Sequence, residues 1–221
     1  MARPARVDSI EPPDDDSHLD MKKLAVFALA AACFGAIPFV RAEVAVGHPA
    51  PDFTLTDTNG KKVSLSSFKG KYVVLEWNNP DCPFVVKHYA TNNMQGLQKA
   101  YTAKGVVWLT INSSATGKEG AYPAAELNQM TQAKGAAQTA YLLDGDGKVG
   151  KTYGAKNTPQ MFVITPEGKI VYSGAIDSIR STNKDDVPKA TNYVKAALDS
   201  TMDGKPVAVP VSQPYGCSVK Y

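Results

Sequence analysis

Two short, almost uninterrupted apolar runs stand out in this chain, "YVVLEW" at 72–77 and "GVVWLTIN" at 105–112. Apolar residues without polar alternation are typical of strands that are buried on both faces of a sheet. Between the runs, residues 83–104 carry apolar side chains at the spacing of a helix face. Pro83 stands at the first helical position, where its missing N–H costs nothing. The pattern therefore predicts a strand, a helix and a second strand.

The remaining segments alternate between strand and helix signals. Asn59-Gly60 is a strong turn signal for a hairpin within 46–71, and Pro-Glu-Gly-Lys is the turn of a second hairpin at 159–174. The other expected elements are a helix at 123–134, a strand at 139–144, a short helix within 145–157, a final helix at 184–202 and a non-helical tail at 205–221. This order predicts an α/β fold with a central mixed β-sheet flanked by helices, an N-terminal β-hairpin and an extended C-terminal tail.

The N-terminal segments are predicted to lie outside the folded domain, which we expect to span 43–204. Residues 1–20 are polar, and we expect them to be disordered and to result from a start codon placed too far upstream. Residues 21–42 have the basic start, apolar stretch and small residues of a signal peptide that is cleaved after Ala42. A retained membrane helix is the alternative, but the apolar run is short for a span. We therefore expect a periplasmic or secreted protein with no stable membrane insertion.

Charge and motifs exclude several classes of partner. The formal net charge is +3, and no run of Lys and Arg marks a nucleic-acid footprint. The sequence has no phosphate loop, hydrolase triad or nucleotide-binding fingerprint, so we expect no cofactor and no nucleic-acid partner. Cys82 and His88 are not expected to bind a metal, because a copper site of that kind needs two clustered cysteines.

The candidate chemistry centres on Cys82, in the stretch "NNPDCPFVVKHY" at 78–89. Cys82 follows a predicted strand and precedes a helix N-terminus, where unpaired N–H groups and the helix dipole stabilise a thiolate. Asn79, Lys87 and His88 are candidates for tuning that thiolate, the last two by adding positive charge from the second helical turn. A buried structural cysteine is the alternative, but such a cysteine is usually flanked by apolar residues. We therefore predict that Cys82 is a reactive nucleophile.

A set of short stretches, taken in order, carries a family resemblance. They are the Pro-rich opening of 46–71, "KGKYVVLEW", "PDCPFVVKHY", "YGAKNTPQMFVITPEGKIVYSGAID" and the terminal "YGCSVKY". Over about 46–221 the chain resembles the thioredoxin-like superfamily, and within it the peroxiredoxin-like AhpC/TSA redoxins. The resemblance implies a thioredoxin-like fold, a reactive cysteine and a cis proline. The residues implied to line the substrate site are Pro83, Phe84, Thr158 and the cis Pro159.

Two departures from the family patterns bear on the activity. Thioredoxins carry Cys-x-x-Cys, and here Val85 stands at the second cysteine position. Peroxiredoxins carry Pro-x-x-x-Thr-x-x-Cys, and here Leu75 and Asn79 replace the Pro and the Thr. The hydroxyl that would orient a peroxide is missing, so a thiol-dependent peroxidase is the alternative and not the first expectation.

Cys217, in the C-terminal tail, is the expected partner of Cys82. Of the three cysteines, Cys33 belongs to the predicted signal peptide, and the other two remain in an oxidising compartment. Gly216 permits a sharp local turn, and we hypothesise that the tail folds back to pair the two thiols. Three alternatives stay open: a resolving bond formed in each cycle, a permanent structural bond in a non-enzymatic binding protein, and no mutual bond.

The expected function is that of an exported thiol-disulfide oxidoreductase. Cys82 attacks a protein or small-molecule disulfide, Cys217 resolves the mixed disulfide, and an upstream thiol reductant regenerates the pair. With a peroxide as substrate, Cys82 would become a sulfenic acid and condense with Cys217. Asp177, in "GAID", is either an acid that lines the site or a cap at a strand end.

Overall fold

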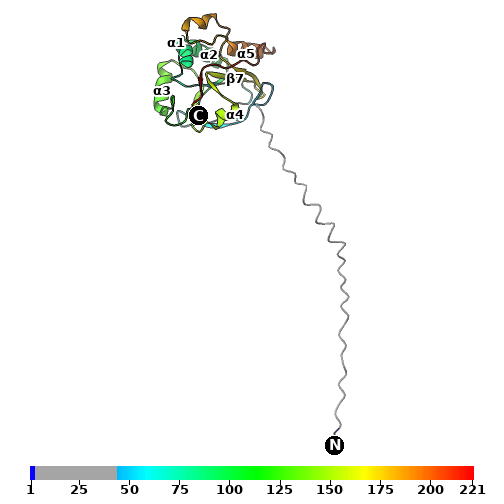
Figure 1. Ribbon diagram of the computed structural model, residues 1–221. Helices are drawn as coiled ribbons and strands as arrows, with labels where there is room; N and C mark the ends of the chain where they lie inside the picture. The colour runs from blue at the N-terminus through cyan, green and yellow to red at the C-terminus, as the bar shows by residue number, and fades with distance from the viewer. Residues whose placement is uncertain (3–43) are drawn as a thin grey trace. The chain divides into compact units, whose positions relative to one another are not determined.

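The computed structural model describes residues 1–2 and 44–221, and the fold lies in the second range (Figure 1). The expectations for a disordered 1–20 and a signal peptide at 21–42 fall almost entirely outside these ranges and stay predictions. Among the described residues, every helix is too short or too polar to cross a membrane.

Within residues 44–221, seven strands form one mixed sheet in the order β2-β1-β5-β4-β3-β7-β8. Their bounds are Thr54–Asp57 (β1), Lys62–Ser64 (β2), Val73–Trp77 (β3), Val107–Asn112 (β4), Ala140–Leu143 (β5), Gln160–Ile164 (β7) and Ile170–Gly174 (β8). β3 pairs in parallel with β4 and antiparallel with β7, so that Val73 lies opposite both Val107 and Ile164. Every residue of β3 and β4 is buried. This burial confirms the two apolar runs as central strands and explains their lack of polar alternation.

Both predicted hairpins are present. β1 and β2 pair antiparallel with Leu55 opposite Val63. Gly60 lies in the connecting turn with a φ of 80°, a conformation that glycine adopts without strain. β7 and β8 form the second hairpin, with Met161 opposite Gly174. The turn residues therefore set both hairpins as the sequence predicted.

Helices cover both faces of the sheet (Figure 1). One face is covered by α1 (Pro83–Ala90), α2 (Asn93–Thr102) and α5 (Tyr193–Met202), and the other by α4 (Lys148–Tyr153) and the 3₁₀ helix η1 (Leu65–Phe68). α3 (Ala124–Ala133) follows β4. Side chains alternate along β3, so that Val74 packs with α1, α2 and α5 while Leu75 packs with the opposite layer. The units β3-α1-α2-β4 and β7-β8-α5 on one sheet are a thioredoxin-like arrangement, which confirms the predicted fold class.

Two predicted helices are wrong in extent. The helix expected at 83–104 is divided into α1 and α2, because Asn92 takes a left-handed conformation with a φ of 57° between them. Asparagine tolerates that conformation better than most residues. The helix expected at 184–202 is divided into the 3₁₀ helix η2 (Lys184–Lys189) and α5. Pro188 lies inside η2 and has no N–H to continue an α-helix.

The tail, residues 205–221, is extended as predicted, but it also makes strand pairings that the sequence did not predict. Ser173 of β8 donates its N–H to the carbonyl of Pro210 and accepts from the N–H of Ser212, both at 3.1 Å. Further on, β9 (Cys217–Ser218) pairs antiparallel with β6 (Asn157–Thr158). The tail therefore follows the β8 edge of the sheet, crosses the segment before β7 and brings the C-terminus close to α4 (Figure 1).

Candidate functional site

Cys82 lies where the loop after β3 enters α1. It is the N-cap residue of α1, and Pro83 occupies the first helical turn. The Cys82 N–H donates to the carbonyl of Asn79 at 3.1 Å, and the Cys82 carbonyl accepts from the N–H of Val86 at 2.8 Å. Backbone bonds on both sides therefore fix the cysteine at the helix N-terminus, where the sequence predicted it. Its side chain is completely buried, at 0% exposed.

The carbonyl of Thr158 faces the Cys82 side chain. Cys82 Sγ donates a hydrogen bond to this oxygen at 3.0 Å. The Thr158–Pro159 peptide bond that follows is cis, as the family resemblance implied. The segment is held on one side by β7, which pairs with β3. Extended backbone beside Cys82 is a surface to which a peptide segment can add as a further strand.

Cys217 lies next to Cys82 because the tail pairs with β6. In that pairing Cys217 is opposite Thr158, so Thr158 contacts both cysteines. Both thiols are free in this structure. Burial raises the pKa of the Cys217 thiol to about 12, and Cys82 adds to the shift as a hydrogen-bond partner and as a charge. Cys217 is therefore protonated at neutral pH.

Gly216 allows the tail to approach the site closely. Its φ is 128°, a region that residues with a Cβ rarely adopt, and a Cβ here would overlap the carbonyl oxygen of Thr158. The side-chain amide of Asn157 donates to the Gly216 carbonyl at 3.0 Å. The sequence suggested that Gly216 permits a sharp turn. In the structure, glycine is required mainly because the tail backbone contacts the Thr158 carbonyl, which also accepts the hydrogen bond from the Cys82 thiol.

The predicted substrate-site residues lie around Cys82 in two groups. Pro83 and Phe84 are on the α1 side, where Pro83 is exposed and Phe84 is half-buried. The Phe84 ring meets the ring of Tyr215 edge-on, with centroids 5.7 Å apart. Thr158 is buried in the loop before β7. In this structure the tail covers the space between the two groups.

Asn79 shapes the loop that precedes Cys82. Its side-chain oxygen accepts from the N–H of Asp81 at 2.9 Å, and its amide donates to the Glu119 carboxylate at 3.3 Å. Asp81, in turn, accepts the hydroxyl of Tyr122 at 2.9 Å. Asn79 therefore links the cysteine loop to the loop after β4, and a tuning effect of Asn79 on Cys82 stays a prediction.

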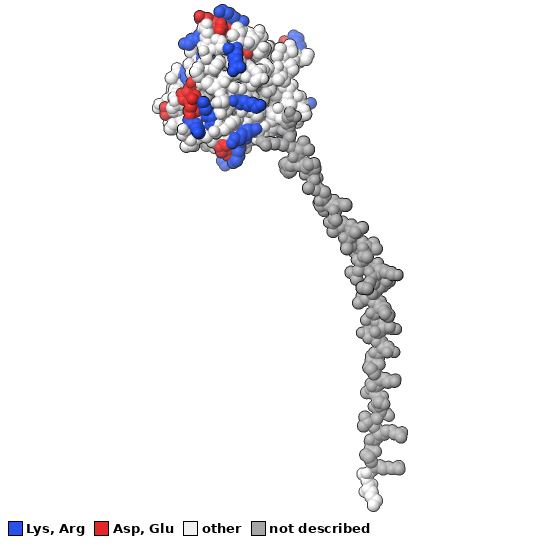
Figure 2. Space-filling model, in the orientation of Figure 1, with Lys and Arg blue, Asp and Glu red and all other residues white. Residues whose placement is uncertain are grey.

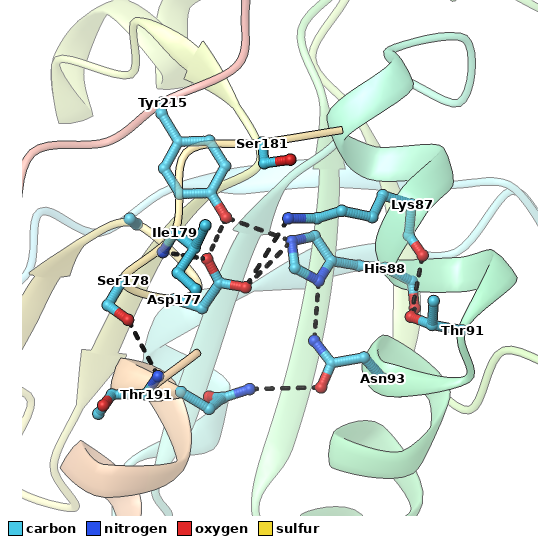
Figure 3. A network of polar contacts seen from close by, with 12 residues as sticks. Lys87, His88, Thr91, Asn93, Asp177, Ser178, Ile179, Ser181, Thr191 and Tyr215 are labelled. Atoms are coloured by element: carbon cyan, nitrogen blue, oxygen red, sulfur yellow. Dashed lines mark hydrogen bonds and ion pairs between the residues drawn. The ribbon is translucent and has the colours of Figure 1, made fainter. Parts of the chain in front are cut away.

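Lys87 and His88 lie against Asp177 (Figure 3). Lys87 Nζ is 3.9 Å and His88 Nε2 is 3.8 Å from the Asp177 carboxylate, and all three side chains are buried. Burial, with a smaller contribution from the Lys87 charge, lowers the pKa of His88 to about 3, so His88 is neutral at pH 7. The expectation that His88 adds positive charge for Cys82 is therefore wrong. The Lys87 charge lies beside a carboxylate that balances it.

Tyr215 completes this group, which we call the Asp177 cluster (Lys87, His88, Asp177 and Tyr215). The Tyr215 hydroxyl donates to Asp177 Oδ1 and lies 3.4 Å from His88 Nε2 (Figure 3). Burial and Asp177 raise the pKa of Tyr215, so its hydroxyl stays protonated at neutral pH. Asp177 also accepts the N–H of Ile179 at 3.1 Å, so it both lines the site and caps a turn. Tyr215 was not among the predicted site residues, although it stands in the terminal "YGCSVKY" motif.

Glu76 is a second buried ionisable residue that was not among the predicted site residues. It is fully buried in β3, and burial raises its pKa although its hydrogen bonds oppose the shift. Its carboxylate accepts from five side chains: Trp108 (2.8 Å), Asn78 (2.9 Å), Tyr89 (3.0 Å), Thr110 (3.3 Å) and Gln98 (3.3 Å). A single charged residue inside the apolar run "YVVLEW" was the available signal.

The charged side chains on the face shown in Figure 2 lie in separate groups, with acidic side chains beside several of the basic ones. Within residues 1–2 and 44–221, no three His, Cys, Asp or Glu side chains are grouped to hold a metal ion.

A sequence model of the AhpC/TSA family matches residues 46–173. The matched range is more than half of the chain and contains Cys82 and the cis Pro159. The chain therefore belongs to the AhpC/TSA family, as its motifs indicated.

Two curated relatives are both thiol-disulfide oxidoreductases named ResA. The protein from Bacillus subtilis is 27% identical over 153 residues, which cover 66% of this chain and 76% of that protein. The protein from Bacillus thuringiensis is 31% identical over 126 residues, which cover 57% of this chain and 67% of that protein.

Two solved structures are similar over most of this chain. An uncharacterized conserved protein from Geobacillus kaustophilus has a TM-score of 0.68 at 29% identity, with 80% of this chain and 93% of that chain covered. A hypothetical protein from Sinorhizobium meliloti has a TM-score of 0.67 at 26% identity, with 80% of this chain and 95% of that chain covered. Both similarities extend beyond the family match.

Proposed function

We propose that this protein is an exported thiol-disulfide oxidoreductase in which Cys82 is the nucleophile and Cys217 is the resolving thiol. The observation that carries the proposal is the shared contact with Thr158, which accepts from Cys82 Sγ at 3.0 Å and pairs with Cys217 in β9. The two relatives described as thiol-disulfide oxidoreductases support the same activity.

The reaction proceeds by two thiol-disulfide exchanges. The Cys82 thiolate attacks one sulfur of a substrate disulfide, and the other sulfur leaves as a thiolate that takes up a proton. Cys217 then attacks Cys82 Sγ, loses its proton and releases the second substrate thiol. The substrate gains two electrons, and the Cys82–Cys217 disulfide is reduced again by an upstream thiol.

The electrostatics of the pair support this order of events. The pKa of Cys217 is raised partly by the charge of Cys82. In a mixed disulfide the contribution of Cys82 is lost, while burial, the larger cause, continues to raise the pKa of Cys217 in the closed tail. Cys217 therefore loses its proton as it attacks and not before.

Pro83, Phe84, Thr158 and Pro159 are proposed to bind the substrate. The β6 backbone at Thr158 accepts a strand from the tail in this structure, and an extended segment around a substrate disulfide can bind the same backbone. The substrate is accordingly a protein or small-molecule disulfide. Export rests on the predicted signal peptide at 21–42, cleaved after Ala42.

Two single-cysteine variants test the proposal. Reduction of a disulfide-bonded peptide by a thiol donor should be abolished in Cys82→Ser, while Cys217→Ser should accumulate a mixed disulfide that intact mass reveals. Retained turnover in Cys82→Ser would overturn the proposal. A parallel assay with hydrogen peroxide distinguishes a thiol-dependent peroxidase. For a peroxidase, the reduction of peroxide would depend on Cys82, and the reduction of the disulfide would not. If neither substrate turns over, the non-enzymatic alternative with a structural Cys82–Cys217 bond is favoured.

A further inference from the structure

The closed tail is incompatible with the first step of the proposed reaction. Cys82 is 0% exposed, with Cys217 on the Thr158 side and the Tyr215 ring against Phe84. A thiolate must reach a sulfur of the disulfide that it attacks. The tail has to leave Cys82 before any external disulfide can react, and it has to return for Cys217 to resolve the product.

Hydrogen bonds on both sides of Cys217 hold the tail. Before Cys217, the Tyr215 hydroxyl donates to Asp177, and the Ser212 hydroxyl accepts from the Ala175 N–H at 2.9 Å. After Cys217, the Val219 N–H donates to the Lys156 carbonyl at 3.0 Å, and the Tyr221 hydroxyl donates to the Ala155 carbonyl at 2.7 Å. Of the partners in these four hydrogen bonds, only the acceptor of the Tyr215 hydroxyl, the Asp177 side chain, is an acidic group.

The bond from Tyr215 to Asp177 differs in strength from its neighbours. A hydrogen bond to an ionised carboxylate is roughly twice as strong as one between neutral groups. Tyr215 also precedes Cys217 by two residues, so that little chain separates the bond from the thiol. This bond therefore constrains the position of Cys217 from the Tyr215 side, together with the β6–β9 pairing at Cys217 itself and the bond from Asn157 to the Gly216 carbonyl.

The same cluster makes closing of the tail costly. Lys87 Nζ and Asp177 Oδ2 have no hydrogen-bond partner among the described residues, and they lie 3.9 Å apart. Buried polar atoms without partners lose the hydration that they would regain in water. The Tyr215 ring centroid lies 5.6 Å from Lys87 Nζ, so opening the tail uncovers this cluster, and the Tyr215 hydroxyl is one of the tail contacts that offset the loss in the closed state.

We propose that Tyr215 and Asp177 form a latch that holds Cys217 against Cys82 and opens to admit the disulfide substrate. The inference rests on the proposed function. Tyr215 and Asp177 are positioning residues, because they act on the reaction through the placement of Cys217.

Tyr215→Phe tests the latch, because it keeps the ring that packs on Phe84 and removes only the hydroxyl. Tyr153→Phe is the matched control, since the Tyr153 hydroxyl donates to the Pro51 carbonyl in the opposite core layer. The readout is the rate at which iodoacetamide alkylates Cys82 in the reduced full chain, located by peptide mass. We expect the alkylation rate to increase by about 10- to 100-fold in Tyr215→Phe, which corresponds to the free energy of a hydrogen bond to a charged group. We expect an unchanged rate in the control.

Two further readouts separate a latch from a structural role. The equilibrium between the Cys82–Cys217 disulfide and glutathione should shift by much less than the alkylation rate in Tyr215→Phe, because the latch is closed in both the dithiol and the disulfide forms. Amide hydrogen exchange should accelerate in the tail and stay unchanged in β3 and β4. An unchanged alkylation rate would overturn the latch, and so would faster exchange throughout the sheet or an equal effect in Tyr153→Phe. None of these readouts uses turnover, so they are independent of the Cys82→Ser assay that tests the function itself.

Discussion

Replacing Gly216 by alanine is predicted to lift the tail from Cys82. Gly216 has a φ of 128°, and a Cβ at this position would overlap the Thr158 carbonyl oxygen. That oxygen also accepts the hydrogen bond from Cys82 Sγ at 3.0 Å. Neither the strained backbone nor the overlap can be relieved without moving β9 away from β6.

The magnitude follows from the backbone conformation. A residue with a Cβ that is held in a sparsely populated φ/ψ region costs about 1–3 kcal/mol. Since about 1.4 kcal/mol is a factor of ten in an equilibrium constant, the open fraction of the tail should rise by about 5- to 150-fold. The overlap with Thr158 acts in the same direction.

Alkylation of Cys82 in the reduced protein reports the open fraction, because the closed tail leaves Cys82 0% exposed. We expect Gly216→Ala to accelerate the alkylation of Cys82 by about 5- to 150-fold, because the rate follows the open fraction that the backbone strain sets. Gly204→Ala is the matched control: Gly204 has a φ of 70°, but a Cβ there meets nothing within 4 Å. An unchanged rate in Gly216→Ala, or an equal acceleration in Gly204→Ala, would refute the reasoning.

Two further predictions concern the buried charges. His88 faces Lys87, Asp177 and Tyr215, and its pKa of about 3 lies below the 6.5 of the unfolded chain. The unfolded chain therefore binds the extra proton, and stability should fall by up to about 1.4 kcal/mol per pH unit as pH decreases from 6.5 toward 3. Urea unfolding across this range should show a shallower pH slope in His88→Gln, and equal slopes would contradict the account. Glu76→Ala should cost more than about 3 kcal/mol of unfolding free energy, because several buried donors lose their acceptor; a loss under about 1 kcal/mol in urea unfolding would show that the donors find other partners.

The strands could be predicted from sequence because burial on both faces leaves a direct signature. The apolar runs at 72–77 and 105–112 contain β3 and β4, and the predicted turn at Asn59-Gly60 connects the two strands of the first hairpin. The ends of the helices were less predictable, because the helical spacing of apolar side chains continues across the break between two helices. Asn92 interrupts the helical pattern by a left-handed conformation that the pattern does not encode.

The part of the site that depends on local sequence could be predicted. Cys82 at a helix N-terminus was correctly placed, since strand end, proline and helix spacing coincide there. The direction of the His88 side chain was not predictable, because it depends on Asp177, which lies far along the chain in another element. The pairing of β9 with β6 was missed for a similar reason: two-residue strands carry too little periodicity to be recognised.

A redox titration of the Cys82–Cys217 pair tests the central claim most directly. The protein would be equilibrated in glutathione and dithiothreitol buffers of graded potential, alkylated and measured by intact mass. The account predicts a disulfide between the two cysteines with a midpoint between about −120 and −270 mV, the range of proteins that exchange disulfides. A midpoint below about −300 mV would mean a permanent structural bond. That result, or the lack of a Cys82–Cys217 disulfide at any potential, would contradict a resolving role for Cys217.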